Sequence, residues 1–245
     1  LINDKIIADT IKNCIGIIVL LSCYYLFSRY YESKKADELS VKYLHKEMPA
    51  GIVLGFAVIS ITIIILYALG YYKVISVSMA NYSAKLFTLL FLAALIEDLL
   101  IRGLIVRLFE KWLGTYFTLI IAMLFETLHM FNNNANALSF FCDLFWGFTM
   151  AMFFIYTKRI WLPFFFHLGW NFAQPFYGSN LTGLNSMGSI LHAEFTGPVL
   201  FTGGAVGLEN SIFTMLMLVL TGSILFYKTK KEGRIVKRKI WPRHL

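Results

Sequence analysis

The chain has 245 residues, of which 58% are hydrophobic and 15% are charged, and its formal net charge is +8. This composition excludes an ordinary soluble domain, because the apolar residues form blocks long enough to cross about 30 Å of hydrocarbon. The basic residues lie at the edges of these blocks and not on a separate soluble module, which argues against a nucleic-acid partner and favours anionic membrane lipids.

Seven apolar blocks predict an all-α fold, a polytopic transmembrane helical bundle with about seven spans. We expect residues 1–245 to form a single membrane-embedded domain. In chain order, the predicted spans are 13–28, 49–72, 84–106, 112–131, 137–156, 160–177 and 206–227.

The positions of Lys and Arg predict the orientation, because basic connections stay preferentially on the cytoplasmic side. The segment 228–245 is strongly basic and is expected to be a cytoplasmic tail, whereas the connections 131–136 and 178–207 contain no Lys or Arg. With an odd number of spans, the N-terminus then lies outside. The stretch 178–207 is long and Gly-rich, and we expect a loose connection there in preference to a lid over a cavity.

The third predicted span contains Glu97, Asp98 and Arg102 within apolar sequence. Ionisable side chains are costly in hydrocarbon, so their presence indicates a functional site. In an α-helix Asp98 and Arg102 share a face, whereas Glu97 points about 100° away from Asp98. We therefore expect Asp98 and Arg102 to neutralise each other and Glu97 to face a cavity. The alternative is an ion pair that only sets helix packing.

Two further pairs have the spacing of four that places both members on one helix face. Phe125 and His129 lie in the fourth span, with Glu126 near the same face, and His167 and Asn171 lie in the sixth. Each pair alone is also typical of polar contacts between membrane helices. Together with Glu97, however, these residues supply a base, a proton carrier and oxyanion donors, which are the groups that hydrolysis of a peptide bond needs.

The segments 97–102, 125–129 and 167–171 resemble, in order, the three motifs of the CPBP family: Glu-Glu-x-x-x-Arg, Phe-x-x-x-His and His-x-x-x-Asn. That family joins CAAX prenyl endopeptidases to bacterial bacteriocin-processing and self-immunity (Abi) membrane proteins. The resemblance covers about 84–177, which we expect to be the catalytic core. Asp98 is the one departure, because it stands where the family usually has a second glutamate.

The resemblance implies a glutamate-type intramembrane endopeptidase that uses no metal or other cofactor. Glu97 would be the general base on a water molecule, His129 would hold that water or pass the proton, and His167 with Asn171 would stabilise the oxyanion. Supporting roles would fall to Asp98, Arg102, Phe125 and Glu126. The substrate would be a membrane-associated peptide or protein, such as a pheromone or bacteriocin precursor, at a bacterial plasma membrane.

Two alternatives remain open at this stage. Glu126 and His129 form Glu-x-x-His, the ligand unit of di-iron bundles, so a metal-dependent membrane hydrolase would use Glu97, Glu126, His129 and His167. The other alternative is a non-catalytic bacteriocin self-immunity or partner-binding membrane protein that keeps the motifs without turnover.

Two features of the spans bear on whether one site forms. Asp143, in the fifth span, belongs to no motif, and we expect a packing residue or a neighbour of the site. With vertical helices, His129 would lie near the outer end of its span and His167 about 10 Å from the inner end. Helix tilt must therefore bring them together for the catalytic interpretation to hold.

Overall fold

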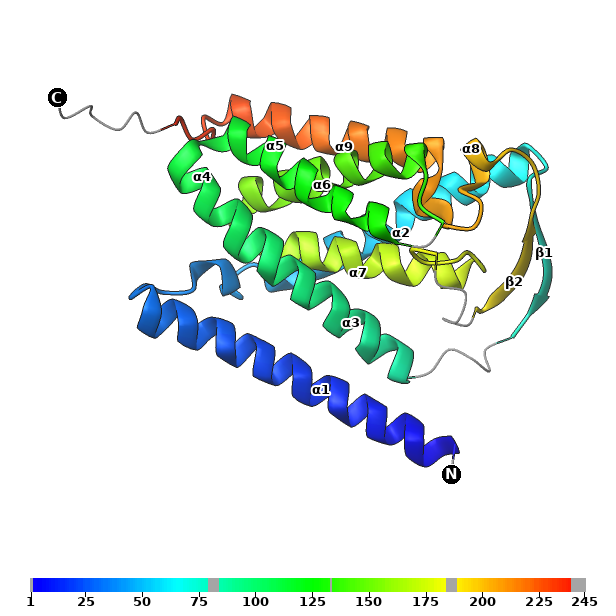
Figure 1. Ribbon diagram of the computed structural model, residues 1–245, viewed down its shortest axis with the longest axis horizontal. Coiled ribbons are helices and arrows are strands. Elements are labelled where there is room, and N and C mark those ends of the chain that lie inside the picture. The colour runs from blue at the N-terminus through cyan, green and yellow to red at the C-terminus, as the bar shows by residue number, and fades with distance from the viewer. Residues whose placement is uncertain (1, 79–83, 133, 184–188, 239–245) are drawn as a thin grey trace.

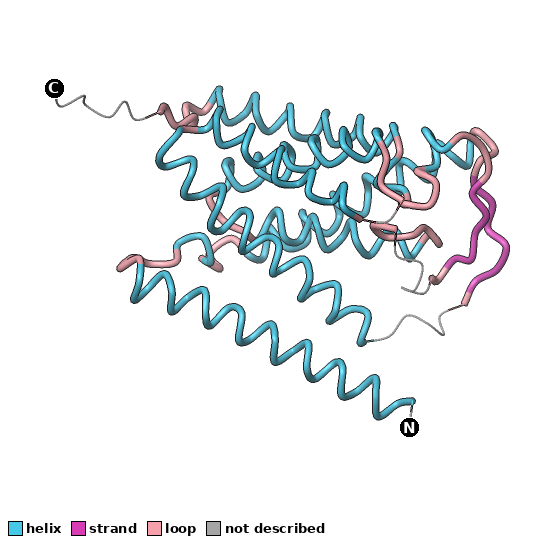
Figure 2. The backbone as a smooth tube through the Cα atoms, viewed as in Figure 1, coloured by secondary structure: helices cyan, strands magenta, loops and turns pink. Residues whose placement is uncertain are grey.

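The computed structural model describes residues 2–78, 84–132, 134–183 and 189–238, and within them the chain is mostly helical (Figures 1 and 2). The α-helices are α1 (Ile2–Leu26), α2 (Leu44–Ala68), α3 (Ala84–Asp98), α4 (Arg107–Leu113), α5 (Thr115–Glu126), α6 (Ala137–Thr157), α7 (Trp161–Phe176), α8 (Val199–Thr202) and α9 (Ile212–Lys231). Two π-helical segments, η1 (Phe27–Tyr31) and η3 (Leu99–Val106), and three 3-10 segments accompany them: η2 (Asp37–Leu39), η4 (Thr127–Phe131) and η5 (Leu208–Asn210).

Each predicted span overlaps a helical rod, once the η segments are joined to the helices that they continue. Within the described residues, four helices are long and apolar enough to cross a membrane: Asp4–Tyr31, Leu44–Ala68, Ala137–Thr157 and Ile212–Lys231. Helix α7 has 16 residues, fewer than the roughly 20 that a straight crossing of the hydrocarbon needs. The structure therefore supports a helical membrane protein, while seven crossings stay a prediction.

The expectation of an all-α fold is wrong in one respect, because β1 (Tyr72–Val77) and β2 (Leu191–Phe195) form a two-stranded antiparallel sheet. Tyr72 pairs with Phe195, and the register shifts between Val74 and Ser76. β1 is rich in β-branched residues that favour extended backbone, and pairing satisfies the hydrogen-bonding groups of two connections at the same end of the bundle.

The stretch 178–207 is likewise not the loose connection that we expected. It contributes β2 and α8, and Leu181 and Val206 are buried against the rest of the chain. Residues 184–188 of this stretch lie outside the described residues. Apolar side chains spaced along the connection hold it against the bundle. Its Gly content led us to expect a loose connection instead.

The basic connections gather at one end of the bundle, the end at which the tail leaves, and the N-terminus lies at the other (Figure 1). Three ion pairs join these connections: Arg107–Glu32, Lys158–Glu110 and Arg159–Glu47. The described part of the tail is tied to the start of α5, where the Thr115 N–H donates to the carbonyl of Val236. This clustering agrees with the charge pattern, although which end faces the cytoplasm stays a prediction.

Helix α7 lies inside the bundle because α2 packs very closely against it. A Cβ at Gly55 would lie 2.0 Å from the carbonyl oxygen of Phe166, and one at Gly169 would lie 2.4 Å from that of Ile52. Gly51 and Gly55 have the small-xxx-small spacing found at close contacts between membrane helices. As a result, the polar residues of α7 face the protein interior and not lipid.

Candidate active site

The first motif lies at the junction between α3 and η3, and the π-helical turn changes which of its residues meet. Hydrogen bonds from i to i+5 bring residues five apart close together, so Glu97 and Arg102 become neighbours. Arg102 Nη1 donates to Glu97 Oε1 at 3.1 Å, Nη2 donates to Glu126 Oε1 at 2.5 Å, and Nε lies 3.4 Å from Asp98 Oδ1. Arg102 is 1% exposed and is shared by three carboxylates, whereas we expected it to pair with Asp98 alone.

Asp98 turns mainly toward the third motif. Its side chain is fully buried, and Oδ2 lies 3.1 Å from Nδ1 of His167. Because a carboxylate only accepts, Nδ1 donates this hydrogen bond. The Trp146 ring packs edge-on against the imidazole, with 5.1 Å between centroids. The residue that departs from the family pattern therefore lies directly behind His167, a contact that helix geometry alone did not predict.

The second motif is split by a change of helix type. Helix α5 ends at Glu126 and the chain continues as the 3-10 helix η4, in which residues four apart no longer share a face. His129 reaches the interior cavity, but Phe125 is 39% exposed and does not line it. The expectation that Phe125 and His129 present one face is therefore wrong.

Glu126 is buried between α5 and α6, with its carboxylate on Arg102 and not in the cavity. Gly147 makes room for it, because a Cβ there would lie 2.9 Å from the Glu126 Cγ. Nδ1 of His129 lies 3.1 Å from the Glu126 backbone carbonyl and therefore donates to it, which leaves Nε2 of His129 available for other partners.

The four residues that we expected to be catalytic all line one cavity of about 350 Å³: Glu97, His129, His167 and Asn171. Trp146 and Trp170 form part of its apolar wall. Helix α3 crosses α7 obliquely (Figure 1), and such tilt lets residues at different heights on straight helices meet. The structure thus brings these side chains together, and their individual roles stay predictions.

Two acids outside the motifs also reach the cavity. Asp143 of α6 lines the cavity itself, whereas we expected it to pack or to lie behind the site. Glu209 of η5 lines it as well and was missed, because it lies in the predicted span 206–227 but belongs to none of the motifs. The available signal was an acid inside a predicted membrane span, since ionisable side chains there indicate a functional site.

The ligand set of the metal alternative is not assembled. Glu126 is held by the guanidinium of Arg102 and does not line the cavity, although its Oε2 lies 3.8 Å from Nδ1 of His129. Within the described residues, no group of three or more His, Cys, Asp and Glu side chains is placed to hold a metal ion.

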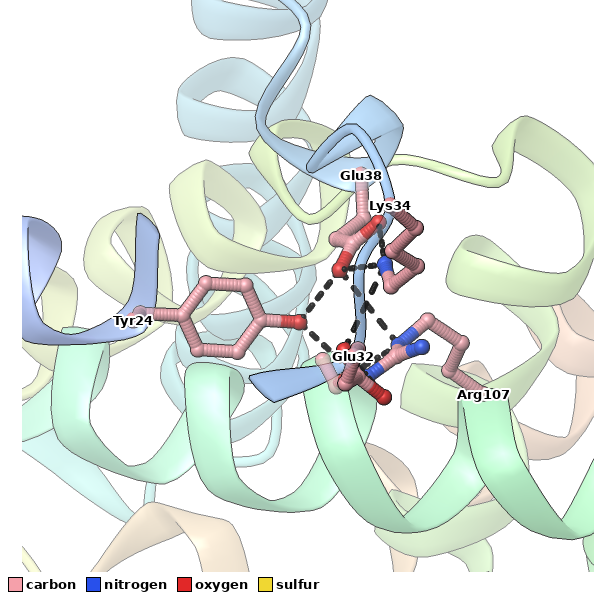
Figure 3. A network of polar contacts seen from close by, with 6 residues as sticks. Tyr24, Glu32, Lys34, Glu38 and Arg107 are labelled. Carbon is pink, nitrogen blue, oxygen red and sulfur yellow. Dashed lines mark hydrogen bonds and ion pairs between the residues drawn. The ribbon is translucent and has the colours of Figure 1, made fainter. Parts of the chain in front are cut away.

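A polar network at the basic end anchors the π-helical segment (Figure 3). The carbonyl oxygen of Gly103, next to Arg102 in sequence, lies 2.7 Å from the Tyr24 hydroxyl and 2.6 Å from Arg107 Nε, both of which donate to it. The same hydroxyl lies 2.6 Å from Glu38 Oε1, so its single proton is shared between Gly103 and Glu38. Glu38 also accepts a hydrogen bond from Lys34 at 2.7 Å. Burial raises the pKa of Glu38, but these hydrogen bonds outweigh it and hold the pKa below its ordinary value.

Comparison with protein families gives a match over residues 78–173 to the family described as type II CAAX prenyl endopeptidase Rce1-like. Comparison with curated proteins and with solved structures gives no match. The matched segment contains all three motifs and the helices α3 to α6 with most of α7. Over this segment the chain is similar to that CAAX-type protease family, which supports the resemblance to the CPBP family carried by the three motifs.

Proposed function

We propose that this chain is an intramembrane endopeptidase that cleaves a membrane-associated peptide or protein with a glutamate-activated water. The observation that carries the proposal is the convergence of Glu97, His129, His167 and Asn171 on one cavity inside an apolar helical bundle. The match of residues 78–173 to a CAAX-type protease family supports the reaction class.

In the proposed mechanism, Glu97 removes a proton from water as the water oxygen attacks the scissile carbonyl carbon. The hydrogen bond from Arg102 occupies Oε1 of Glu97, so Oε2 is the oxygen that accepts this proton. Nε2 of His129 helps to hold the water or relays the proton. The proton then passes to the amide nitrogen as the carbon–nitrogen bond breaks.

The negative charge that develops on the carbonyl oxygen is stabilised from α7. A doubly protonated His167 donates Nδ1–H to Asp98 and Nε2–H to the oxyanion, while the amide of Asn171 donates a second hydrogen bond. Because α7 is packed on several sides, both donors are held in place before the reaction begins. Asp98 supports the positive charge on the ring that this role requires.

The test uses the purified full chain in liposomes with quenched-fluorescent peptides. Glu97→Gln preserves size and the hydrogen bond from Arg102 but removes the base, so cleavage falls by roughly 10²–10⁴-fold. Glu232→Gln, which changes an acid of the tail with a partly exposed side chain, serves as the matched control and retains cleavage. Cleavage by Glu97→Gln at the rate of the unaltered protein contradicts the mechanism. Loss of cleavage with chelators, reversed by added metal, favours a metal-dependent hydrolase instead.

The second candidate is a non-catalytic self-immunity or partner-binding membrane protein. One observation favours it: the departure from the family pattern, Asp98, contacts the imidazole that the mechanism needs. This candidate predicts that bacteriocin protection or partner control survives Glu97→Gln unchanged, whereas the protease proposal predicts its loss.

The proposed setting is a multi-pass protein of a bacterial plasma membrane, with a pheromone or bacteriocin precursor as substrate. We propose seven spans in a single domain, a catalytic core over about 84–177, an outside N-terminus and a cytoplasmic tail over 228–245. Basic residues at the tail end support this orientation and contact with anionic lipids, and give no support to a nucleic-acid partner. Reporter fusions after residues 31, 69 and 231 test the topology.

A further inference from the structure

The cavity holds more carboxylates than hydrolysis of a peptide requires. Besides Glu97, it is lined by Asp143 and Glu209, and among the described residues no Lys or Arg lines it. The lining groups that can carry positive charge are His129 and His167, which the proposed reaction already uses. Asp143 and Glu209 therefore face the cavity without a cation of their own within the described chain.

Both acids are half-buried, and the hydrogen-bond donors that contact them within the described residues are uncharged. Oδ2 of Asp143 is buried and has no hydrogen-bond partner within the described residues. Oε2 of Glu209 accepts a hydrogen bond at 3.0 Å from the neutral amide of Gln174, and Thr182 also donates to this carboxylate. Carboxylates removed from water are costly unless a donor or a cation compensates them. An occupant of the cavity that carries positive charge supplies this compensation.

Glu209 is held in position by a specific local structure. Its partner Gln174 is fully buried on α7, one turn beyond Asn171. Before Glu209, Gly207 adopts φ +118°, and a Cβ there would lie 2.1 Å from the carbonyl oxygen of Asn180. The close contact at Gly207 therefore fixes the position of the turn that carries Glu209. This packing directs the Glu209 side chain into the cavity.

A second polar group, the amide that the proposed mechanism directs at the substrate, also marks the cavity as a binding site. Asn171 is 8% exposed and lines the cavity, yet its side chain makes no hydrogen bond within the described residues. Buried polar side chains are nearly always paired, so a partner for this amide is expected from whatever enters the cavity. The described residues provide no set of three or more metal ligands, which favours an organic cation over a metal ion as the charged group.

We propose that Asp143 and Glu209 bind the positively charged side chain of a Lys or Arg residue close to the scissile bond of the substrate. This inference rests on the proposed endopeptidase function and names part of its substrate class. Trp146 and Trp170, in the same cavity, provide apolar surface for the aliphatic stem of such a side chain. A basic residue near the bilayer is costly without a counter-charge, so the two acids also explain how it enters the site.

The experiment uses the purified full chain and a short quenched-fluorescent Leu/Ala host peptide, in which Lys, norleucine or Glu is placed at each position in turn. The expected result is one position at which Lys raises kcat/KM about 10-fold to 100-fold over norleucine, the range for a hydrogen bond to a charged group. Asp143→Asn and Glu209→Gln each reduce this Lys-to-norleucine ratio. Glu194→Gln, an exposed acid on β2, is the matched control and leaves the ratio unchanged. In Glu209→Lys, the preference turns toward the Glu peptide.

The possible failures are distinguishable. Cleavage without preference for Lys or Arg at any position overturns this inference and leaves the endopeptidase function intact. If no peptide is cleaved by the unaltered protein, the endopeptidase proposal fails in this assay, and binding decides the inference. Glu97→Gln then binds the Lys peptide more tightly than the norleucine peptide if the acids act as proposed. Equal binding of the two peptides overturns the inference.

Discussion

Replacing Arg102 by Met removes the single guanidinium that three carboxylates share. Met fills much of the same volume without charge, so the change isolates the electrostatic role of Arg102. The residue is 1% exposed, and Asp98 and Glu126 have fully buried side chains, so water does not replace the lost cation. We therefore expect a large loss of stability together with loss of activity.

The magnitude follows from the cost of leaving buried charges unpaired. Removing one partner of a buried ion pair costs about 3–5 kcal/mol. For a chain of this size, each kcal/mol corresponds to about 2–4 °C in Tm, so a decrease of roughly 6–20 °C is expected. Protonation of one of the three carboxylates limits the loss of stability, so we expect a decrease in Tm toward the lower part of this range.

The assay is thermal unfolding of purified protein in detergent, followed by intrinsic tryptophan fluorescence. Adding Glu126→Gln to Arg102→Met removes one unpaired charge, so the double variant unfolds at a higher temperature than Arg102→Met alone. In the unaltered background Glu126→Gln lowers the unfolding temperature, because it removes a 2.5 Å charged hydrogen bond. Additive effects of the two substitutions refute the proposed sharing of Arg102.

Three further predictions test other parts of the structure. Asp98→Asn keeps the size of the side chain but removes the charge behind His167, so we expect kcat to fall roughly 10²–10³-fold while KM changes little. Steady-state kinetics measures both constants, and a change in KM alone contradicts the role of Asp98 in supporting the charge on His167. Gly55→Ala places a Cβ 2.0 Å from a carbonyl oxygen of α7, so we expect the free energy of unfolding to fall by about 1–3 kcal/mol or more. Thermal unfolding measures this loss, and an unchanged Tm shows that α2 and α7 do not pack as described. The lowered pKa of Glu38 stabilises the folded state fully above the ordinary glutamate pKa of about 4.3, and this contribution fades as the pH falls through the folded pKa. The difference in Tm between the unaltered protein and Glu38→Gln therefore shrinks below about pH 4, and a difference that is constant across this range contradicts the assignment.

Composition and local periodicity were enough to locate the helices, and the resemblance of three short segments to known motifs indicated the family. Apolar blocks predicted a helical rod in each of seven places, and the spacing of Glu97, His129 and His167 within those rods carried the resemblance that the family match confirms. These properties depend on neighbours within a few residues, so they can be read without knowing how the helices pack.

Only the tertiary structure decided how the site is assembled. The π-helical turn moved Arg102 onto Glu97 and Glu126, and the 3-10 turn separated Phe125 from His129, because packing against other helices outweighs the small energy differences between helix types. Glu209 reaches the cavity from η5, at the start of a predicted span whose sequence did not show which way the acid would face. Such contacts join residues far apart in the chain, and burial and charge pairing select them only when the whole bundle has formed.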